Sequence, residues 1–349
     1  MPELIVTNFN SNFTGVSATA AAVLRQQKAQ YDLALAGHAL PGAPAPITPR
    51  EAMRLSRTIP PGRPFTIWHV RRNPEMRVAI WARDVLRLPI RIVFTSAAIR
   101  RHSAYPRWLI SRMDAVIATT QEAAGFVPHV RAIVPHGVET DRFTPALDRA
   151  AAWAKTGYSG AQCVATIGRI RPEKGTDRFV EAMLTLLPKQ PGTTALVIGR
   201  ATKEHHGFLN DLKAKVAKAH LDDRILFPGE IAPDALPELM RALSLIVQLP
   251  RYEGYGMTPL EGMASGVPFV ATDQGYYRAF SGQGQSGLIT QDAASDIDAL
   301  LSDPDRLNRM AQTARESALQ HFSIDREVTE IASVYQDLWN TAPHRVSSG

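Results

Sequence analysis

The sequence of 349 residues contains a single cysteine, Cys163, and no long apolar run. One cysteine cannot form an intramolecular disulfide, and such sparing use of cysteine fits a reducing, cytosolic setting. No apolar run approaches the ~18 residues that a membrane-spanning helix needs, and the N-terminus shows no basic-then-apolar signal pattern. We therefore expect a cytoplasmic protein that is soluble or bound peripherally to a membrane.

The sequence also has no zinc-ligand spacing and no signature of a nucleic-acid-binding fold, so neither a zinc site nor a nucleic-acid partner is expected. Two triplets, Asp296-Ile297-Asp298 and Asp303-Pro304-Asp305, have the Asp-x-Asp spacing of some manganese sites. Both stand where a helix is expected to begin, and aspartate is preferred at the N-cap and in the first turn. Helix capping is the favoured interpretation, and no metal site is predicted.

Positive charge dominates the chain, with a formal net charge of +6 and an isoelectric point near 9.5. This balance predicts anionic partners, and a nucleotide diphosphate or an anionic lipid surface fits it best. Much of the charge lies in one stretch without lysine, which contains Arg71, Arg72, Arg77, Arg83, Arg87, Arg91, Arg100, Arg101, Arg107 and Arg112. Arginine binds phosphate and carboxylate with two parallel hydrogen bonds, which lysine cannot form. The alternative is that this run of arginines is a solvent-exposed face, as such runs usually are.

Short apolar runs alternate with helical patterns along the chain, which predicts an α/β fold with parallel sheets. The expected strands of the first half are Leu4–Thr7, Leu33–Ala36, Thr66–Val70, Ile90–Thr95, Ala115–Ala118 and Ala132–Val134. Those of the second half are Cys163–Ile167, Ala195–Ile198, Ile225–Phe227, Ser244–Leu249 and Phe269–Thr272.

The length exceeds what one hydrophobic core usually supports, so two domains are expected. We place an N-terminal domain at residues 1–145 and a C-terminal domain at residues 146–324. Residues 325–349 are expected to form a last amphipathic helix, 325–339, followed by a disordered tail.

The segment from Glu253 to Glu261 is the most informative part of the sequence. It connects an apolar run that predicts a buried strand with a helix that has Pro259 in its first turn. Gly254 and Gly256 allow the backbone to approach a ligand, and the free N–H groups of the helix offer donors to a phosphate. Glu261 then accepts hydrogen bonds from sugar hydroxyls. The alternative is a glycine-rich turn with two solvated acids.

A second strand, turn and helix begins at the apolar run Val164–Ile167 and continues through Gly168-Arg169-Ile170-Arg171-Pro172-Glu173-Lys174-Gly175. Arg169 and Lys174 lie five positions apart on the expected loop. Together they can neutralise a diphosphate, arginine as a bidentate fork and lysine as a mobile point charge. Solvated loop cations are the alternative for either residue taken alone.

The two loops together resemble the retaining glycosyltransferases of family 4. That family has the GT-B architecture, in which two Rossmann-like domains face each other across a cleft. The resemblance implies that Arg169 and Lys174 contact the donor diphosphate. It implies that Glu261 holds the nucleotide ribose and that Glu253 meets hydroxyls of the transferred sugar, in a catalytic role. A further match is the segment Pro135-His136-Gly137-Val138-Glu139 at the domain junction.

The N-terminal half resembles the bacterial lipopolysaccharide core mannosyltransferases, which use GDP-mannose and add mannose to the Kdo region of the lipid A core. The similar segments are 8–17, 68–73 and 94–102, and the first of them places Gly15 at the donor. The expected donor-binding residues are thus Gly15, Arg169, Lys174, Gly254, Tyr255, Gly256, Met257, Thr258 and Glu261.

Histidine and arginine residues follow two neighbouring strands of the expected N-terminal sheet. His69 comes at the end of one strand, where it is expected to face the cleft and to orient or polarise the acceptor hydroxyl as a catalytic residue. Cations cluster with it and predict the acceptor-binding residues Arg71, Arg72, Arg100, Arg101 and His102. An anionic acceptor explains this clustering, and a neutral sugar does not.

The resulting hypothesis is the transfer of a sugar, from GDP-mannose, with retention, to an anionic lipopolysaccharide core acceptor. The partners expected are a nucleotide sugar, an anionic glycolipid and the inner leaflet of the cytoplasmic membrane, with no cofactor and no metal. Two alternatives remain open from the sequence: a nucleotide-sugar epimerase of the same architecture, and a non-catalytic protein that binds a sugar nucleotide or lipopolysaccharide.

Overall fold

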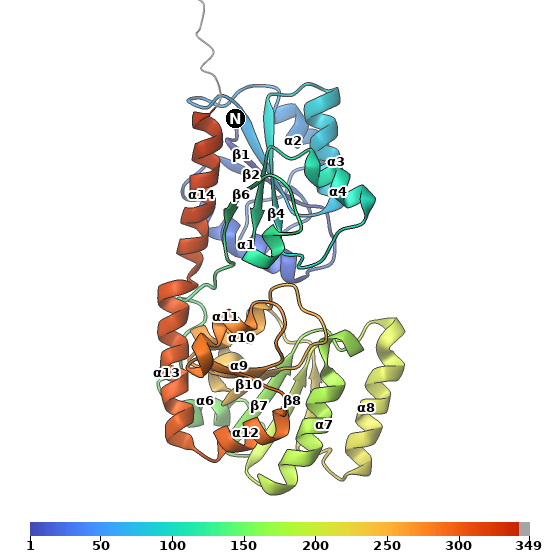
Figure 1. Cartoon of the computed structure of the whole chain (residues 1–349), viewed down its shortest axis with the longest axis vertical. Coiled ribbons are helices and arrows are strands. Elements are labelled where there is room, and N and C mark those ends of the chain that lie inside the picture. Colours follow the sequence, from blue (N-terminus) through green and yellow to red (C-terminus); the bar gives the residue numbers. More distant parts are fainter. Residues whose placement is uncertain (342–349) are drawn as a thin grey trace, which may run out of the picture. The chain divides into compact units, whose positions relative to one another are not determined.

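The computed structural model describes residues 1–341 and divides the chain into two compact units (Figure 1). Unit 1 comprises Met1–Gly137 and Ile324–Gly349, and unit 2 comprises Val138–Ser323. Each unit contains a six-stranded sheet whose paired strands are parallel. The tail that we expect to be disordered falls on residues 342–349, which lie outside the described residues.

The sheet of unit 1 has the strand order β2-β1-β3-β4-β5-β6. Its strands are β1 (Leu4–Asn8), β2 (Leu33–Gly37), β3 (Thr66–Val70), β4 (Ile90–Ser96), β5 (Ala115–Ala118) and β6 (Val130–Ile133). The helices are α1 (Gly15–Gln27), α2 (Pro49–Leu55), α3 (Asn73–Ile80), the π-helical turn η1 (Trp81–Val85), α4 (Ala104–Ser111), α5 (Gln121–Ala124) and α14 (Ile324–Asn340).

Helices cover both faces of this sheet, as the near-continuous burial of its central strands requires. Helices α1 and α14 pack on one face, where Ile67, Val93 and Ile117 form a core with Val328 and Ile331 of α14. Helices α2, α3 and α4 pack on the other face. Figure 1 shows α14 alongside the sheet of unit 1, although its sequence follows the whole of unit 2.

The sheet of unit 2 has the order β12-β11-β10-β7-β8-β9. Its strands are β7 (Gln162–Ile167), β8 (Thr193–Ile198), β9 (Ile225–Gly229), β10 (Leu245–Gln248), β11 (Phe269–Ala271) and β12 (Gly287–Ile289). The longer helices are α6 (Arg149–Lys155), α7 (Thr176–Leu186), α8 (His206–Lys218), α9 (Leu236–Ala242), α10 (Met257–Ala264), α12 (Ala293–Leu301) and α13 (Pro304–His321). Single turns are η2 (Pro172–Lys174), η3 (Leu187–Lys189), η4 (Lys203–His205), α11 (Tyr277–Phe280) and η5 (Gly282–Gly284).

Two parallel Rossmann-like sheets confirm the α/β fold class, and every expected strand is present with its ends shifted by about two residues or fewer. The short strand β12 is not among the predicted ones. The capping interpretation of Asp303 is confirmed, because its carboxylate accepts a hydrogen bond from Arg306 N at 2.9 Å. Asp296 lies in the first turn of α12, behind the N-cap Asp292.

Candidate active site

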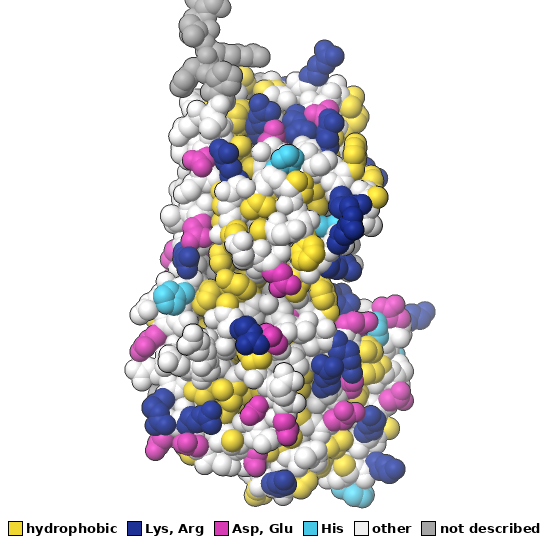
Figure 2. Space-filling model, viewed as in Figure 1, with side chains coloured by type: hydrophobic (Ala, Val, Ile, Leu, Met, Phe, Trp, Pro, Cys, Tyr) yellow, Lys and Arg dark blue, Asp and Glu magenta, His cyan; other side chains and the backbone are white. Residues whose placement is uncertain are grey.

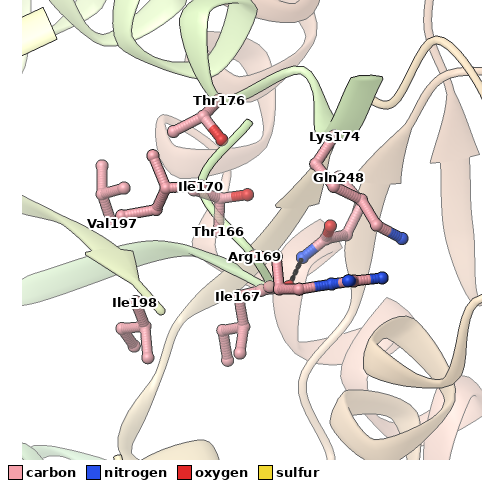
Figure 3. A pocket seen from close by; sticks show the side chains of 10 residues that line it. Thr166, Ile167, Arg169, Ile170, Lys174, Thr176, Val197, Ile198 and Gln248 are labelled. Carbon is pink, nitrogen blue, oxygen red and sulfur yellow. Dashed lines mark hydrogen bonds between the residues drawn. The ribbon is translucent and has the colours of Figure 1, made fainter. Parts of the chain in front are cut away.

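A pocket opens at the carboxyl edge of the unit 2 sheet, the edge at which open parallel sheets bind ligands. It is lined by Thr166, Ile167, Gly168, Arg169, Ile170, Lys174, Thr176, Val197, Ile198 and Gln248 (Figure 3). These residues come from the ends of β7, β8 and β10 and from the loop after β7. Gln248 Nε2 donates to the Ile167 carbonyl at 3.0 Å, the dashed bond in Figure 3, and so ties the end of β10 to that of β7.

Two glycines let the loops at this edge pack backbone to backbone. A Cβ on Gly175 would lie 1.8 Å from the carbonyl oxygen of Leu249, and the residue has a φ of +69°. A Cβ on Gly199 would lie 1.8 Å from the carbonyl oxygen of Gly168, at a φ of +140°. Only glycine fits either position. The loop after β7 is therefore held against the segments that follow β8 and β10.

The two predicted diphosphate cations both line the pocket, but only one of them has a partner. Figure 3 shows the Arg169 and Lys174 side chains extending toward the same side. Lys174 Nζ forms an ion pair with Glu253 Oε2 at 2.5 Å. Arg169 makes no hydrogen bond or ion pair within residues 1–341, and partial burial, with the charge of Arg171, lowers the pKa of Arg169. An unpaired arginine beside a paired lysine is an arrangement that can take up an anion.

The loop from Glu253 to Gly256 leads into α10 as the sequence predicts. Gly256 is its N-cap, with a φ of +93°, and a Cβ there would lie 2.1 Å from the ring of Tyr277. Gly254 N donates to the Glu253 carboxylate at 3.1 Å. The N–H groups in the first turn of α10 stay available to a ligand, as at any helix start.

Three other predicted donor residues lie in this loop and in the first turn of α10. The Tyr255 side chain is 4% exposed and stacks on Tyr276 at 5.2 Å, so its ring belongs to the core. Met257 also packs against that core. The Thr258 hydroxyl donates to the Ile167 carbonyl at 3.5 Å, at the limit for a hydrogen bond. A direct contact from the Tyr255 side chain to a ligand is therefore not supported, and its contribution is limited to the backbone.

Glu261 lies in the second turn of α10 and is partly buried. Burial raises the pKa of Glu261 to about 7, against a lowering by the nearby charge of Arg142. Its carboxylate accepts no hydrogen bond from any residue in the described part of the chain. A sheltered carboxylate with open acceptor positions suits a ligand that brings hydroxyl donors, as a ribose does.

His69 lies in the predicted strand, but, contrary to expectation, its side chain is not accessible to an acceptor. It is part of β3, its side chain is 0% exposed, and both ring nitrogens have partners. Nδ1 lies 2.5 Å from the Tyr335 hydroxyl and Nε2 lies 2.7 Å from Thr95 Oγ1. Burial, with the charge of Arg71, holds the pKa of His69 well below its usual value. The His69 side chain is thus enclosed within unit 1, and this burial argues against the expected direct contact with an acceptor hydroxyl.

Arg72 is also placed differently from the expectation. Its guanidinium donates to Asn8 Oδ1 at 2.9 Å, to Ser17 Oγ at 2.9 Å and to Glu75 Oε1 at 3.1 Å. It is therefore occupied in fixing the loop between β1 and α1. We correct its assignment from acceptor binding to support of that loop, which ends directly before Gly15, the first residue of α1. Gly15 itself is exposed, and a Cβ there would meet nothing within 4 Å.

Glu75 is the residue at this edge that the sequence analysis missed. It is 0% exposed and accepts from Thr7 Oγ1, Phe9 N, Arg71 N, Arg72 N and Arg72 Nη1. These bonds join the loops after β1 and β3. A signal existed: glutamate three residues after a helix N-cap, with proline in the first turn, is typical of a capping box.

The remaining predicted acceptor residues lie at the carboxyl edge of the unit 1 sheet. Arg71 is partly buried, and its Nη1 has no hydrogen-bond partner among residues 1–341. Arg100 and Arg101 are exposed on the loop after β4. His102 Nε2 is buried and also lacks a partner in the described chain, and burial lowers the pKa of His102.

Part of the arginine-rich stretch is neutralised within unit 1. Asp114 pairs with Arg83 at 2.6 Å and with Arg91 at 3.0 Å. Asp84 pairs with Arg112 at 2.6 Å, and hydrogen bonds from the arginines hold the pKa of Asp84 at about 2. The stretch is therefore not a uniform binding face. Its exposed cations include Arg77, Arg87, Arg101 and Arg107.

Comparison with known proteins identifies the family. Residues 152–317 match the family model described as glycosyl transferases group 1. The lipopolysaccharide core biosynthesis mannosyltransferase LpsB of Rhizobium meliloti is 41% identical over 96% of this chain and 97% of its own. The chain belongs to the group 1 glycosyltransferases. LpcC of Rhizobium leguminosarum bv. viciae, also a lipopolysaccharide core biosynthesis mannosyltransferase, is 40% identical over 96% of each chain.

The fold of this glycosyltransferase is GT-B. The crystal structure of Anabaena HepE (Alr3699) in complex with UDP and glucose gives a TM-score of 0.83 over 97% of this chain and 100% of that one. The two are 16% identical, so this likeness concerns the fold alone. As a group 1 glycosyltransferase the chain is an enzyme, and the donors of its family are nucleotide sugars.

Two further observations concern metals and membranes. Within residues 1–341, no three histidine, cysteine, aspartate or glutamate side chains are grouped so that they could hold a metal ion. Nor, in that part of the chain, is any helix long and apolar enough to span a membrane.

Proposed function

We propose that the enzyme transfers mannose from GDP-mannose, with retention, to the Kdo region of an anionic lipopolysaccharide core acceptor. The observation that carries this proposal is the 41% identity, over nearly the whole length of both chains, to a lipopolysaccharide core mannosyltransferase. The likeness includes unit 1, to which we assign the acceptor. Residues 1–145 thus correspond to an acceptor-binding domain and residues 146–324 to a donor-binding domain in this proposal.

The geometry of unit 2 supports the donor assignment. Arg169 and Lys174 provide two cations beside the free N–H groups of α10, where a diphosphate can lie. As the bond from the sugar to the diphosphate breaks, negative charge develops on the leaving oxygen, and prearranged donors stabilise it there. Glu253 and Glu261 face the same loop from its two ends, and they bind hydroxyls of the sugar and of the ribose.

The charges of unit 1 support an anionic acceptor. Arg71, Arg100, Arg101 and His102 lie at the carboxyl ends of β3 and β4, which are hydrogen-bonded neighbours. Carboxylates and phosphates are the groups that an arginine fork binds in two-point contacts. Kdo brings a carboxylate and lipid A brings phosphates, so both satisfy these cations.

The same unit carries a surface suited to an anionic membrane. Trp81 of η1 is 45% exposed, and Trp108 of α4 is 52% exposed and stacks on Tyr105. Figure 2 shows Lys and Arg side chains gathered over the part of unit 1 where Figure 1 places α4. Exposed tryptophan beside arginine is typical of interfacial anchoring. We propose peripheral binding to the inner leaflet of the cytoplasmic membrane through this surface.

A thermal-shift panel of nucleotides and nucleotide sugars tests the donor assignment. GDP and GDP-mannose are expected to raise the melting temperature, since a ligand at a hundred times its Kd adds about 2.7 kcal/mol of stability. UDP, UDP-glucose and ADP-glucose are the comparison ligands, and Lys174→Ala is expected to remove the GDP shift. Stabilisation by a uridine or adenine nucleotide in place of GDP would contradict the guanine assignment.

A further inference from the structure

One face of the unit 1 sheet changes from apolar to polar toward its carboxyl edge. Ile67, Val93 and Ile117 belong to the core beneath α1 and α14. Because side chains two residues apart share a face of a strand, the next positions on this face are His69, Thr95 and Thr119. Arg71 follows His69 on the same face, and its electrostatic neighbours include Tyr335 and Glu327 of α14. A buried polar layer therefore lies under the C-terminal helix.

Some groups in this layer are fully satisfied. His69 lies between Tyr335 and Thr95, with both ring nitrogens at hydrogen-bond distance. The Glu327 carboxylate is 3% exposed and contacts His136 Nδ1 at 2.7 Å and Gly137 N at 2.8 Å. These contacts fix the position of α14 against β3 and against the segment after β6. Each Glu327 oxygen is thus engaged with one donor, and neither forms a hydrogen bond with Arg71 in the described residues.

Arg71 is the exception. Its backbone N donates to Glu75 Oε2 at 2.7 Å, but its guanidinium makes no hydrogen bond or ion pair within residues 1–341. The Glu75 oxygens are already occupied by backbone amides, by Thr7 and by Arg72. The charge of Arg71 is therefore balanced by neighbouring carboxylates while its N–H donors stay unused. Unused donors on a sheltered arginine are rare unless a ligand takes them.

Thr119 is a second unpartnered group on this face. It follows β5, is 0% exposed, and its hydroxyl has no partner in the described residues. Its backbone N donates to the Ser96 carbonyl at 3.0 Å, which fixes it beside the end of β4. Two strand spacings of ~4.8 Å separate β3 from β5. An arginine fork on one side and a hydroxyl on the other thus lie across β4 from each other.

We propose that Arg71 and Thr119 form an oxyanion subsite that binds the carboxylate of the sugar-acid residue of the acceptor. The inference rests on the proposed function and deepens it. It assigns the recognition of the acid to Arg71 and excludes Arg72, whose donors are committed to Asn8 of β1 and Ser17 of α1. A carboxylate takes two parallel N–H donors from Arg71 and one hydroxyl donor from Thr119. A phosphate of the acceptor lipid has the same chemistry and is the competing source.

A binding experiment on the full chain, without donor, tests the subsite independently of transfer. Kdo monosaccharide is titrated into wild type, Arg71→Gln and Thr119→Val, with inorganic phosphate as the second ligand. We expect Kdo to bind wild type, Arg71→Gln to weaken it at least about tenfold, and Thr119→Val to weaken it severalfold. Arg57→Gln, which removes an exposed arginine of the same unit, is expected to change nothing.

The outcomes separate the possibilities. Equal Kdo affinity in wild type and Arg71→Gln overturns the proposal, and so does binding of phosphate without binding of Kdo. Neither substitution removes an observed side-chain hydrogen bond, and melting temperatures close to wild type are expected. If Arg71→Gln fails to fold, Thr119→Val and Arg71→Lys provide the same comparison, and a wild-type Kdo affinity in both overturns the proposal.

A kinetic experiment adds the specificity readout. An acceptor with the Kdo carboxylate is compared with the same acceptor reduced to the alcohol, and the ratio of the two kcat/KM values is measured. Wild type is expected to prefer the acid, and Arg71→Gln to bring the ratio close to one by raising KM for the acid alone. A preference that survives in Arg71→Gln contradicts the assignment. If GDP-mannose proves to be the wrong donor, the donor-free titration still decides on the subsite.

Discussion

Lys174 Nζ lies 2.5 Å from Glu253 Oε2, which joins the loop after β7 to the loop before α10 across 79 residues of sequence. Their side chains are 22% and 18% exposed. The proposed diphosphate cation is thus paired with the proposed sugar-binding carboxylate. Under the proposed function, we expect a nucleotide sugar to exchange this ion pair for two separate contacts, Lys174 with the phosphate and Glu253 with a sugar hydroxyl.

This exchange predicts different results for the two partners. Lys174→Ala is expected to weaken GDP binding and to lower transfer by about 100- to 1000-fold, the usual effect of losing an oriented charge in a closed site. Glu253→Ala is expected to lower transfer as strongly and to change GDP affinity much less, because the proposed partner of Glu253 is the sugar, which GDP lacks. Steady-state kinetics and GDP titration measure the two effects separately.

Lys215→Ala is the matched control, because Lys215 forms an exposed ion pair with Glu181 at 3.5 Å elsewhere in unit 2. Such surface pairs contribute little, so wild-type kinetics are expected for this variant. Near-normal turnover in Lys174→Ala would remove this residue from the donor site.

The Lys174–Glu253 contact also marks what the sequence alone leaves open. The sequence predicts both residues for the donor site, and the structure brings their loops together. The sequence alone cannot predict that Lys174 and Glu253 pair with each other, because their pairing depends on how closely Gly175 packs on Leu249. Arg71 and Arg72 are a similar case. As neighbours in sequence they have the same expected role, yet only Arg72 reaches the end of β1, at Asn8, and the start of α1, at Ser17.

Glu261 is expected to make the stability of the enzyme depend on pH. Burial raises the pKa of Glu261 from 4.5 to about 7. Between these values the folded state holds a proton that the unfolded chain has lost, so stability falls as pH rises through this window and levels off above it. Glu261→Gln removes this effect and is expected to be more stable than wild type at pH 8, by about 1–3 kcal/mol, with little difference at pH 4.5.

Urea unfolding of ligand-free wild type and Glu261→Gln at the two pH values measures the difference. The same substitution is expected to weaken GDP binding, because an amide cannot accept ribose hydroxyls as a carboxylate does. The difference in unfolding free energy between Glu261→Gln and wild type is expected to be larger at pH 8 than at pH 4.5. The same difference at both pH values would contradict the assignment of the pH dependence to Glu261.

In the proposed donor site the positive charge comes from the protein itself, so we expect transfer to continue without divalent metal. Arg169, Lys174 and the start of α10 supply the positive charge that the leaving diphosphate requires. Transfer assays with EDTA and with added manganese measure this directly. Loss of activity in EDTA that manganese restores would replace this account with a metal-assisted one.

Membrane binding is expected to depend on tryptophan and on charge together. Trp108→Ala should weaken binding to vesicles that contain phosphatidylglycerol, because it removes an exposed interfacial side chain. Raising the salt concentration should weaken the binding of wild type, because basic residues near such a surface contribute about 1 kcal/mol each. Tyr252→Ala is the control, because Tyr252 is an exposed aromatic residue of unit 2, whereas Trp153 is buried there. Equal binding to neutral and anionic vesicles would rule out this surface.

The fold is largely predictable because its strands are buried on both faces. Runs such as Cys163–Ile167 stand out as continuous apolar segments, and the structure places β7 there. Strand β12 escapes prediction because Gly287, Leu288 and Ile289 are too few to form a pattern. His69 is misplaced for a different reason. His69 lies one position before the end of β3. Helix α14, which is distant in sequence, covers the face of the sheet to which the His69 side chain points.

Transfer itself is the most direct test of the account. The purified enzyme is incubated with GDP-mannose and a Kdo-terminated lipid A acceptor, and the product is examined by mass spectrometry and NMR. The account predicts one added hexose on Kdo, with the anomeric configuration of the donor retained, and no product with a neutral glycan acceptor. The proposed function would be contradicted if GDP-mannose and the Kdo-terminated acceptor gave no product while another nucleotide sugar or an uncharged acceptor supported transfer.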